Sequence, residues 1–376
     1  MQNTIKPNKR LLSLDVFRGA TVAAMILVNN PGDWGHIYAP LEHSEWNGCT
    51  PTDLIFPFFL FIVGVSIVFA LDAKKKILEN HLSLTRIILK RTVILFCLGL
   101  LMSLQPYFDF ATVRIPGVLQ RIALVYLASA LIFLYAIPQN IFKIFIVLLS
   151  SYWLMMILIP VPGFGAANLE MESNLGAWLD RTLLTENHLW ILSKTWDPEG
   201  ILGTLPSIAS GLFGVMMGSI LRTESRTADN KVAWLFAFGF IAFLLGLTWG
   251  LFFPINKSLW TSSFVLYSGG LASMGLALCY WLIDVKGFTK FTKPFVIYGV
   301  NAITVYFVSG IVARSMNLLK TTLNGQEVSW KNFLYEQFFT PYFSPNNASV
   351  AWAISFVLIW YIILWAMFKR NIVIKV

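Results

Sequence analysis

The segment from residue 29 to residue 53 holds the densest group of side chains that could do chemistry. It contains two of the chain's four histidines, His36 and His43, among several amides and carboxylates. Histidine is the side chain best suited to move a proton, or to accept a group as a nucleophile, near neutral pH. Asp53 could orient such a ring; alternatively, it caps the helix predicted to begin there. The segment therefore indicates acid–base or nucleophilic chemistry, and a merely solvated loop histidine is the simpler alternative.

A zinc site is a second interpretation of these histidines. Zinc ligands in proteins usually follow short, repeated spacings. Six residues separate His36 from His43, and the nearby carboxylates are scattered. This arrangement matches no strong ligand pattern, so we expect no metal. The chain has three cysteines, and they form neither a CxxC pair nor a disulfide framework.

A second polar group lies in the sequence RIPGVLQR, which contains Arg114, Gln120 and Arg121. A guanidinium group can hold a phosphate through two parallel hydrogen bonds, so these residues are candidates for binding a phosphate-bearing ligand. Arg18 is a further candidate, although its spacing from Asp15 also fits an ion pair on one helix face. The alternative for Arg121 is a bond to the carbonyl groups of a neighbouring helix.

Two more polar residues adjoin or interrupt apolar runs. Glu199 stands in DPEGILGT, where Pro198 and an acidic side chain also fit an ordinary helix start. Asn301 stands inside GVNAITVYF, and a buried amide there costs more than packing alone requires. Both residues are candidate polar groups of a binding site.

An all-α, polytopic membrane bundle must position these residues. Of the 376 residues, 57% are apolar and 12% are charged, which is about half the charged fraction of soluble domains. A membrane span needs about 20 mostly apolar residues. Runs of this kind predict about ten spans, at residues 12–30, 53–72, 87–105, 117–137, 142–161, 201–221, 232–252, 261–283, 295–315 and 348–368.

The positive charges predict the orientation of this bundle. Most of the 28 Lys and Arg residues fall in alternate connections, including residues 6–10 and 369–375 at the two ends. Basic connections stay in the cytoplasm, so both termini are predicted to be cytoplasmic and the first span to be uncleaved. The net charge of +9 is then a topology signal, and no nucleic-acid partner is expected. We expect a single transmembrane domain over residues 1–376, with long outer loops at about 31–52, 162–200 and 316–347.

Several stretches of the chain resemble the heparan-α-glucosaminide N-acetyltransferase family. They are LLSLDVFRGATVAAMILVNN, EHSEWNGCTPTDLIFPFFLFIVGVSI, RIPGVLQRIALVYL, DPEGILGTLPSIASGLFGVMMGSIL and GVNAITVYF. The resemblance runs from Leu11 to Phe307 in the same order and with similar gaps. It implies a transmembrane acyltransferase, and the chain looks like a bacterial member with ten spans in the inner membrane.

The resemblance implies a reaction as well. Acetyl would pass from cytosolic acetyl-CoA, with no metal, to the amine of a glucosamine-type sugar on the extracytoplasmic side. His43 in HSEWNG would be the catalytic histidine, and the family's asparagine at the end of the first span falls on Asn29. We expect Asp53 to orient the ring and Asn29 or Asn301 to donate to the oxyanion. The expected coenzyme A ligands are Arg114, Gln120, Arg121 and Arg18, and the expected acceptor ligands are Glu199, Asn301, Asn47 and Trp46.

Two other functions stay open at this stage. A secondary transporter would use buried charges as a substrate path, but it should show paired broken helices in its two halves, and the sequence suggests none. An O-acetyltransferase acting on a surface polysaccharide would need the same donor. The expected partners are an amino-sugar acceptor, coenzyme A and the lipid bilayer, and a homodimer is a further possibility.

Overall fold

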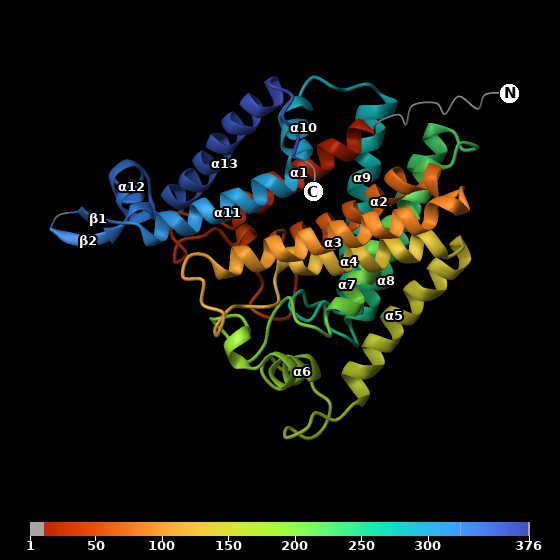
Figure 1. The fold of residues 1–376 in the computed structure, drawn as a ribbon, viewed down its shortest axis with the longest axis horizontal. Coiled ribbons are helices and arrows are strands. Elements are labelled where there is room, and N and C mark those ends of the chain that lie inside the picture. Colours follow the sequence, from red (N-terminus) through yellow and green to blue (C-terminus); the bar gives the residue numbers. More distant parts are fainter. Residues whose placement is uncertain (1–10, 324, 375–376) are drawn as a thin grey trace.

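Long helices form almost all of the computed structural model, which describes residues 11–323 and 325–374 (Figure 1). The basic residues at positions 6–10 and 375, which entered the orientation prediction, lie outside the described residues. The longer helices are α1 (Leu12–Val28), α2 (Ile55–Lys75), α3 (His81–Leu104), α4 (Val118–Tyr135), α5 (Pro138–Leu158), α7 (Thr204–Arg222), α8 (Ala228–Gly250), α9 (Ser262–Tyr280), α11 (Ala302–Leu318) and α13 (Pro345–Lys369).

Shorter elements join or cover these helices. They are η1 (Ala39–Leu41), η2 (Thr52–Leu54), η3 (Leu78–Asn80), α6 (Leu175–Leu184), η4 (Glu186–His188), the π-helical turn η5 (Trp281–Val285), α10 (Lys293–Val300), α12 (Trp330–Phe338) and the strands β1 (Lys320–Leu323) and β2 (Gln326–Ser329). The two strands pair antiparallel, with Lys320 opposite Ser329. This hairpin projects from one end of the molecule beside α12 (Figure 1).

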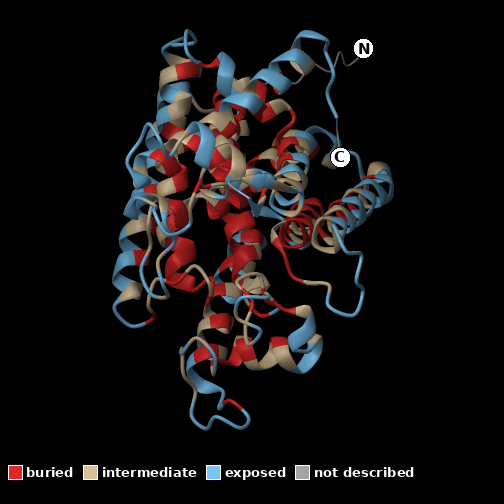
Figure 2. Ribbon diagram, turned by 90° about the vertical axis from the view of Figure 1, so that its left-hand side faces the viewer, coloured by how far each residue is buried: buried red, intermediate tan, exposed pale blue. Residues whose placement is uncertain are grey.

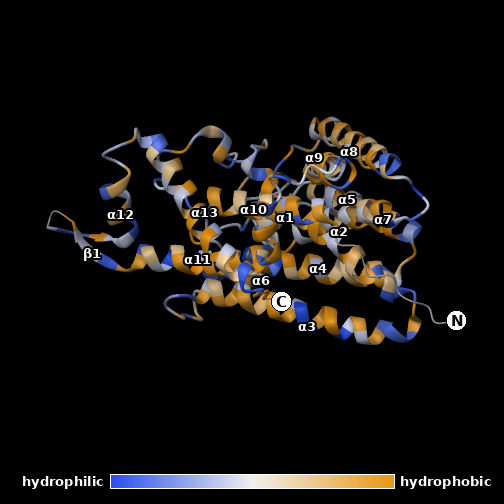
Figure 3. Cartoon of the chain, turned by 90° about the horizontal axis from the view of Figure 1, so that it is seen from above, coloured by the Kyte–Doolittle hydropathy of each residue, from blue (hydrophilic) through white to orange (hydrophobic). Residues whose placement is uncertain are grey.

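Eight helical segments among the described residues are long and apolar enough to cross a membrane. Apolar residues dominate the long helices, whereas hydrophilic residues gather in turns and connections (Figure 3). The prediction of an all-α integral membrane protein is therefore confirmed, with boundaries close to those expected. The predicted first span corresponds to α1, whose 17 residues extend about 26 Å, slightly less than the bilayer core of about 30 Å. The count of ten spans and the cytoplasmic termini stay predictions.

The helices α2 and α7 form the centre of the bundle. The apolar part of α2 is 61% buried and that of α7 is 67% buried, whereas the values for α3 and α8 are both 22% (Figure 2). The two central helices approach closely at glycines: a Cβ on Gly64 would lie 1.9 Å from the Gly211 carbonyl oxygen. Small residues permit such backbone contact in membranes, where dispersion must replace the hydrophobic effect between helices. This packing fixes α2, and the short helix η2 just before it contributes Asp53 to the candidate site.

The predicted span at 295–315 is wrong as a continuous helix. It is divided at Asn301 into α10 and α11, which are bent by 79° relative to one another. The side chain of Asn301 accepts a hydrogen bond from the Ile374 backbone N–H and donates one to the Ile372 carbonyl. Contacts with the C-terminal segment thus stabilise a break that an apolar run does not reveal.

The connection at residues 31–52 contacts two other connections that lie far from it in the sequence. Trp46 donates from Nε1 to the Leu169 carbonyl at 2.9 Å. At the other end of the loop, Tyr38 donates to Asn347 Oδ1 at 2.8 Å, and Gly32 N–H donates to the Ser349 carbonyl at 3.2 Å. The segment that carries both histidines is thereby held by contacts far apart in sequence.

Candidate active site

His43 and Asp53 form the central pair of the candidate site. Nδ1 of His43 lies 2.6 Å from Oδ1 of Asp53. The other carboxylate oxygen accepts from Ser44 N–H, Thr50 N–H and the Thr50 hydroxyl, at 3.0–3.1 Å. The alternative prediction that Asp53 caps a helix is wrong, because its side chain makes no capping hydrogen bond at the start of η2 or α2. A carboxylate only accepts hydrogen bonds, so Nδ1 carries the proton and Nε2 keeps its lone pair for chemistry.

The burial of this pair is uneven in a way that suits catalysis. The side chain of Asp53 is 1% exposed, whereas that of His43 is 48% exposed. The carboxylate is therefore a fixed internal partner, and the ring can be reached from the surface. His36 forms a similar contact with Asp33 at 2.6 Å, but both of those side chains are exposed, at 49% and 42%. Among the histidines that the structure describes, only His43 therefore combines an accessible ring with a buried orienting carboxylate.

Lys257 is a member of the site that the sequence did not predict. Its Nζ lies 3.3 Å from Nδ1 and 3.4 Å from Nε2 of His43, and 4.0 Å from Asp53 Oδ1. Burial lowers the pKa of Lys257, and the charges of Glu199 and Asp53 oppose this shift. In the sequence it is one outer cation among several, and its position in a short connection between two apolar runs is the only available signal.

The connections carrying His43 and Lys257 are tied together through their backbones. Gly48 N–H donates to the Ile255 carbonyl at 2.8 Å, and Asn256 donates from Nδ2 to Asn47 Oδ1 at 3.2 Å. Trp46, besides its bond to the outer loop, packs edge-on against Trp196 with ring centroids 5.1 Å apart. Trp46 and Asn47, which were predicted to bind the acceptor, thus lie beside the site but use these polar groups to fix its loops.

Arg114 binds the DPEG segment rather than standing free. It donates to Asp197 through two hydrogen bonds of 2.6 and 2.8 Å, and to Glu199 Oε2 at 2.5 Å. Asp197 and Glu199 are almost fully buried at 0% and 7% side-chain exposure. Interaction with these carboxylates raises the pKa of Arg114 further, against the effect of its own burial. The cluster joins the RIPG segment to the connection before α7, and Glu199 also lies within electrostatic range of Lys257.

Arg121 and Gln120 lie deeper in the bundle. Arg121 is 1% exposed and donates to the Pro198 and Gly200 carbonyls, both at 2.9 Å, while its guanidinium lies over the Trp260 ring. These contacts match the alternative of a carbonyl-binding arginine, except that the carbonyls belong to a connection and not to a helix. Gln120 is 4% exposed, and its side chain packs against Gly99 of α3 and Gly117 in the loop before α4. The structure thus brings Arg114, Arg121 and Gln120 together as internal supports, and their role in coenzyme A binding stays a prediction.

Arg18 lies in a different place, on a cavity of about 490 Å³. It donates to Asp15 Oδ1 at 3.1 Å, as the spacing predicted, and to Ser66 Oγ at 2.8 Å. Lys74 and Arg91 also line this cavity. The buried Nε of Arg91 has no hydrogen-bond partner among the residues that the structure describes. The cavity therefore offers cationic donors, at least one of them unused, and the residues beside Asn301 form part of its wall.

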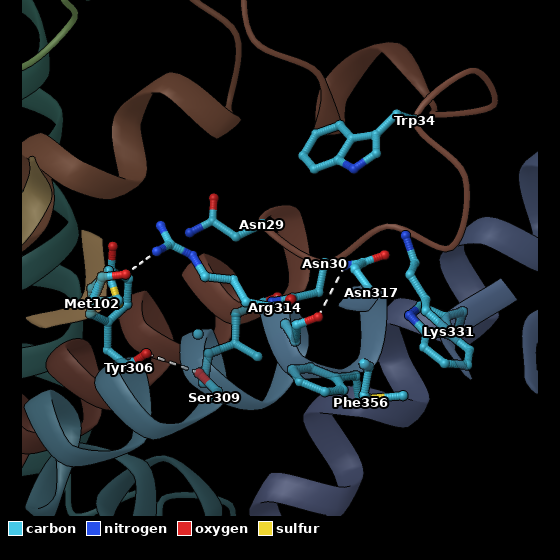
Figure 4. Close-up of a pocket in the computed structure, with 15 residues that line it drawn as sticks. Asn29, Asn30, Trp34, Met102, Tyr306, Ser309, Arg314, Asn317, Lys331 and Phe356 are labelled. Atoms are coloured by element: carbon cyan, nitrogen blue, oxygen red, sulfur yellow. Dashed lines mark hydrogen bonds between the residues drawn. The ribbon is translucent and has the colours of Figure 1, made fainter. Parts of the chain in front are cut away.

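Asn29 lines a second cavity of about 280 Å³, shown in Figure 4. The amides of Asn29, Asn30 and Asn317, the indole of Trp34 and the cations Arg314 and Lys331 surround it. Arg314 donates to the Met102 carbonyl. Asn29 is exposed, and His43 is not among the residues lining this cavity. Asn29 and His43, which were predicted to share the catalytic step, therefore do not line the same cavity.

A family model described as "Heparan-alpha-glucosaminide N-acetyltransferase, catalytic" matches residues 10–253. The chain belongs to this family. The matched range contains His43 and Asp53, and it ends shortly before Lys257. The resemblance inferred from the sequence is thereby confirmed.

Two mammalian members are similar over most of the chain. Heparan-alpha-glucosaminide N-acetyltransferase of Homo sapiens is 33% identical over 353 aligned residues, covering 79% of this chain and 52% of the human protein. The Mus musculus protein of the same name is 31% identical over 350 residues, covering 79% of this chain and 53% of its own length. The chain thus spans about half the length of these relatives. The family membership supports an acyltransferase in a membrane.

Proposed function

We propose that this protein is a transmembrane N-acetyltransferase that moves acetyl from cytosolic acetyl-CoA to the amine of a glucosamine-type sugar on the extracytoplasmic side. The observation that carries the proposal is the His43–Asp53 pair, because it lies within the family's catalytic range and presents an accessible Nε2. The relatives are named as N-acetyltransferases of a glucosaminide. For this chain we place the enzyme in a bacterial inner membrane.

His43 has two ways to promote acyl transfer. As a general base, its Nε2 removes a proton from the sugar amine while that amine attacks the acetyl carbon. As a nucleophile, the same nitrogen takes the acetyl group first and then passes it to the amine. In both routes Asp53 holds the ring and stabilises the positive charge that the imidazole gains. Trapping of labelled acetyl on the protein without acceptor distinguishes the two routes.

The cavity beside Arg18 is our candidate site for the coenzyme A head group. Its cations Arg18, Lys74 and Arg91 suit the phosphates of coenzyme A, and the unpartnered Nε of Arg91 supplies a donor without breaking an existing bond. Lys74 belongs to the basic stretch 74–76 that predicts the cytoplasmic side. A donor that enters from the cytosol would reach these residues before the candidate active site.

Helix α2 and its first turn connect this cavity with the catalytic pair. Phe59, Ile62 and Ser66 line the cavity, and Asp53 lies just before the same helix. From Ser66 to Asp53 the helix rises about 20 Å at 1.5 Å per residue. The pantetheine arm would have to follow this path to bring the thioester toward His43. Such a route would bring a donor from the cytosol to a histidine that the sequence predicts on the outer side.

The cavity beside Asn29 is our candidate site for the acceptor sugar. Its amides can hydrogen-bond sugar hydroxyls, and the indole of Trp34 offers an apolar face for a sugar ring. Burial lowers the pKa of Lys331, and its interaction with Asp33 opposes this shift. The positive charge of Arg314 and Lys331 disfavours a protonated amine nearby, so an acceptor would tend to enter as the neutral nucleophile.

The test compares the two histidine–aspartate pairs in the purified protein. His43→Ala should abolish transfer of labelled acetyl from acetyl-CoA to glucosamine, whereas His36→Ala is the matched control and should retain it. Right-side-out and inside-out vesicles carrying the protein then report on which side the donor and the acceptor are used. A sugar whose amine is replaced by a hydroxyl tests the O-acetyltransferase alternative.

Three outcomes would contradict this proposal in different ways. Label that never leaves coenzyme A with any acceptor removes the enzyme function and leaves the transporter. Equal activity of the His43→Ala variant and the wild type removes His43 from the site. Preferential labelling of the hydroxyl sugar replaces the amine as acceptor.

A further inference from the structure

The ammonium group of Lys257 has an unusual environment for a buried cation. Its side chain is 17% exposed, and its closest carboxylate oxygen, on Asp53, is 4.0 Å away. Among the described residues its closest polar contacts are the ring nitrogens of His43, Nδ1 at 3.3 Å and Nε2 at 3.4 Å, and because Nδ1 carries the proton only Nε2 can accept a hydrogen bond from it. Burying a charge is costly unless it is paired directly. The ion pair of Lys257 with Asp53 is too long, at 4.0 Å, to be a hydrogen bond, so the ammonium group keeps donors that can turn toward a substrate beside Nε2.

Hydrogen bonds of the neighbouring residues fix the backbone on which Lys257 stands. Asn256 is fully buried; it donates to Asn47 and accepts from the Leu259 backbone N–H at 2.8 Å. The Asn256 N–H donates to the Thr261 hydroxyl at 3.0 Å. The connection that carries Lys257 is therefore fixed at both sides of the residue, and it is bonded to the HSEWNG segment that carries His43. A cation on such a support needs little reorganisation during a reaction.

We propose that Lys257 is a catalytic residue that stabilises the oxyanion formed during acetyl transfer. This inference rests on the proposed function. When the amine nitrogen bonds to the acetyl carbon, the π electrons of the carbonyl move to its oxygen, and the Lys257 ammonium is placed to pair with that negative charge. When the oxygen returns its electrons, the carbon–sulfur bond breaks and the pair leaves with the thiolate of coenzyme A. The proton removed from the amine through His43 then neutralises the thiolate.

The position of Lys257 favours this role over that of a structural cation. A structural lysine would make a direct bond to a carboxylate or carbonyl oxygen, as Arg114 and Arg121 do in the same region. Lys257 instead lies 3.4 Å from Nε2, the ring nitrogen that would act on the substrate.

The experiment replaces Lys257 and then restores its charge chemically. Lys257→Met should lower kcat about 100- to 1,000-fold, as loss of one oxyanion donor does, with a much smaller change in KM for either substrate. Lys257→Cys, made in a background in which the three native cysteines are replaced, should be equally impaired. Treatment with 2-bromoethylamine then creates an aminoethyl side chain that is nearly the length of lysine, and this should restore most of the activity. Lys320→Met, at an exposed position of the hairpin, is the control.

The possible results distinguish the proposed role of Lys257 from the proposed acetyltransferase function. Thermal unfolding of each variant in detergent identifies loss of folding, and restoration by alkylation identifies a role of the charge itself. Wild-type transfer with an unimpaired Lys257→Met variant overturns the role of Lys257 alone. Impairment that alkylation does not reverse also overturns it. Absence of transfer in the wild type overturns the proposed function and this inference together.

Discussion

The ring of His43 and the carboxylate of Asp53 are joined by a contact of 2.6 Å in which one partner is nearly buried and the other is half-exposed. His36 and Asp33 have the same separation, but solvent reaches both side chains. Equal distance therefore does not give equal chemistry. Three further hydrogen bonds fix the Asp53 carboxylate, so it can hold one tautomer of the ring, whereas Asp33 is free to exchange its partner for water.

Removal of the Asp53 charge should impair catalysis without removing the ring. Asp53→Asn preserves the shape but lets an amide N–H face His43, which favours the tautomer with its lone pair on Nδ1. We expect kcat to fall about 100- to 10,000-fold, measured as transfer of labelled acetyl to glucosamine. Asp33→Asn is the matched control and should remain near wild-type activity. Similar losses in the two variants would contradict an orienting role that is specific to Asp53.

Replacement of Arg91 should weaken binding of the donor, acetyl-CoA, and leave binding of the acceptor sugar unchanged. Arg91→Gln removes a cation from the cavity that we assign to coenzyme A, and loss of one charge-assisted hydrogen bond costs about 1.5–3 kcal/mol. The KM for acetyl-CoA should therefore rise about tenfold or more, while the KM for glucosamine stays nearly constant. Lys90→Gln removes the neighbouring exposed cation and serves as the control. Equal effects of the two substitutions would indicate a general surface-charge effect and would move the head group elsewhere.

Asp180 should make the stability of the outer region depend on pH. Burial raises the pKa of this carboxyl to about 7 from an ordinary value of 3.8. The folded state therefore binds this proton more tightly than the unfolded chain does. The resulting stabilisation is complete below about pH 4 and is lost as the pH rises through about 7.

A substitution isolates this contribution. Asp180→Asn keeps an oxygen that can accept from the Ile201 backbone N–H, a bond of 2.8 Å in the wild type, and it removes the titration. The drop in thermal unfolding midpoint between pH 5 and pH 8 should be smaller in Asp180→Asn than in the wild type. Glu172→Gln, an exposed change in the same outer loop, should show the wild-type drop. A variant that is as sensitive to pH as the wild type would show that Asp180 does not titrate in this range.

The sequence determined the membrane character of the protein and the position of most helices. Apolar runs of about 20 residues and the low charge leave few other structures, because backbone groups in lipid must bond within their own helix. Motifs such as HSEWNG and DPEGILGT also indicated the family, which the comparisons confirm, and they made His43 the candidate catalytic histidine. An apolar run carries no information about a break, however, and the division at Asn301 depends on bonds to residues 372 and 374.

Tertiary structure decided which polar residues work together. From the sequence, Arg114 and Arg121 were candidates for binding a phosphate, with carbonyl groups as the alternative partners of Arg121, and Lys257 was an outer charge. In the structure the two arginines are bound by carboxylates and carbonyls, whereas Lys257 lies against His43. The sequence shows the type and spacing of a charge, but the partner of a charge is set by which distant loops the bundle brings together. Here the Asn47–Asn256 contact brings two connections that are about 200 residues apart to one imidazole.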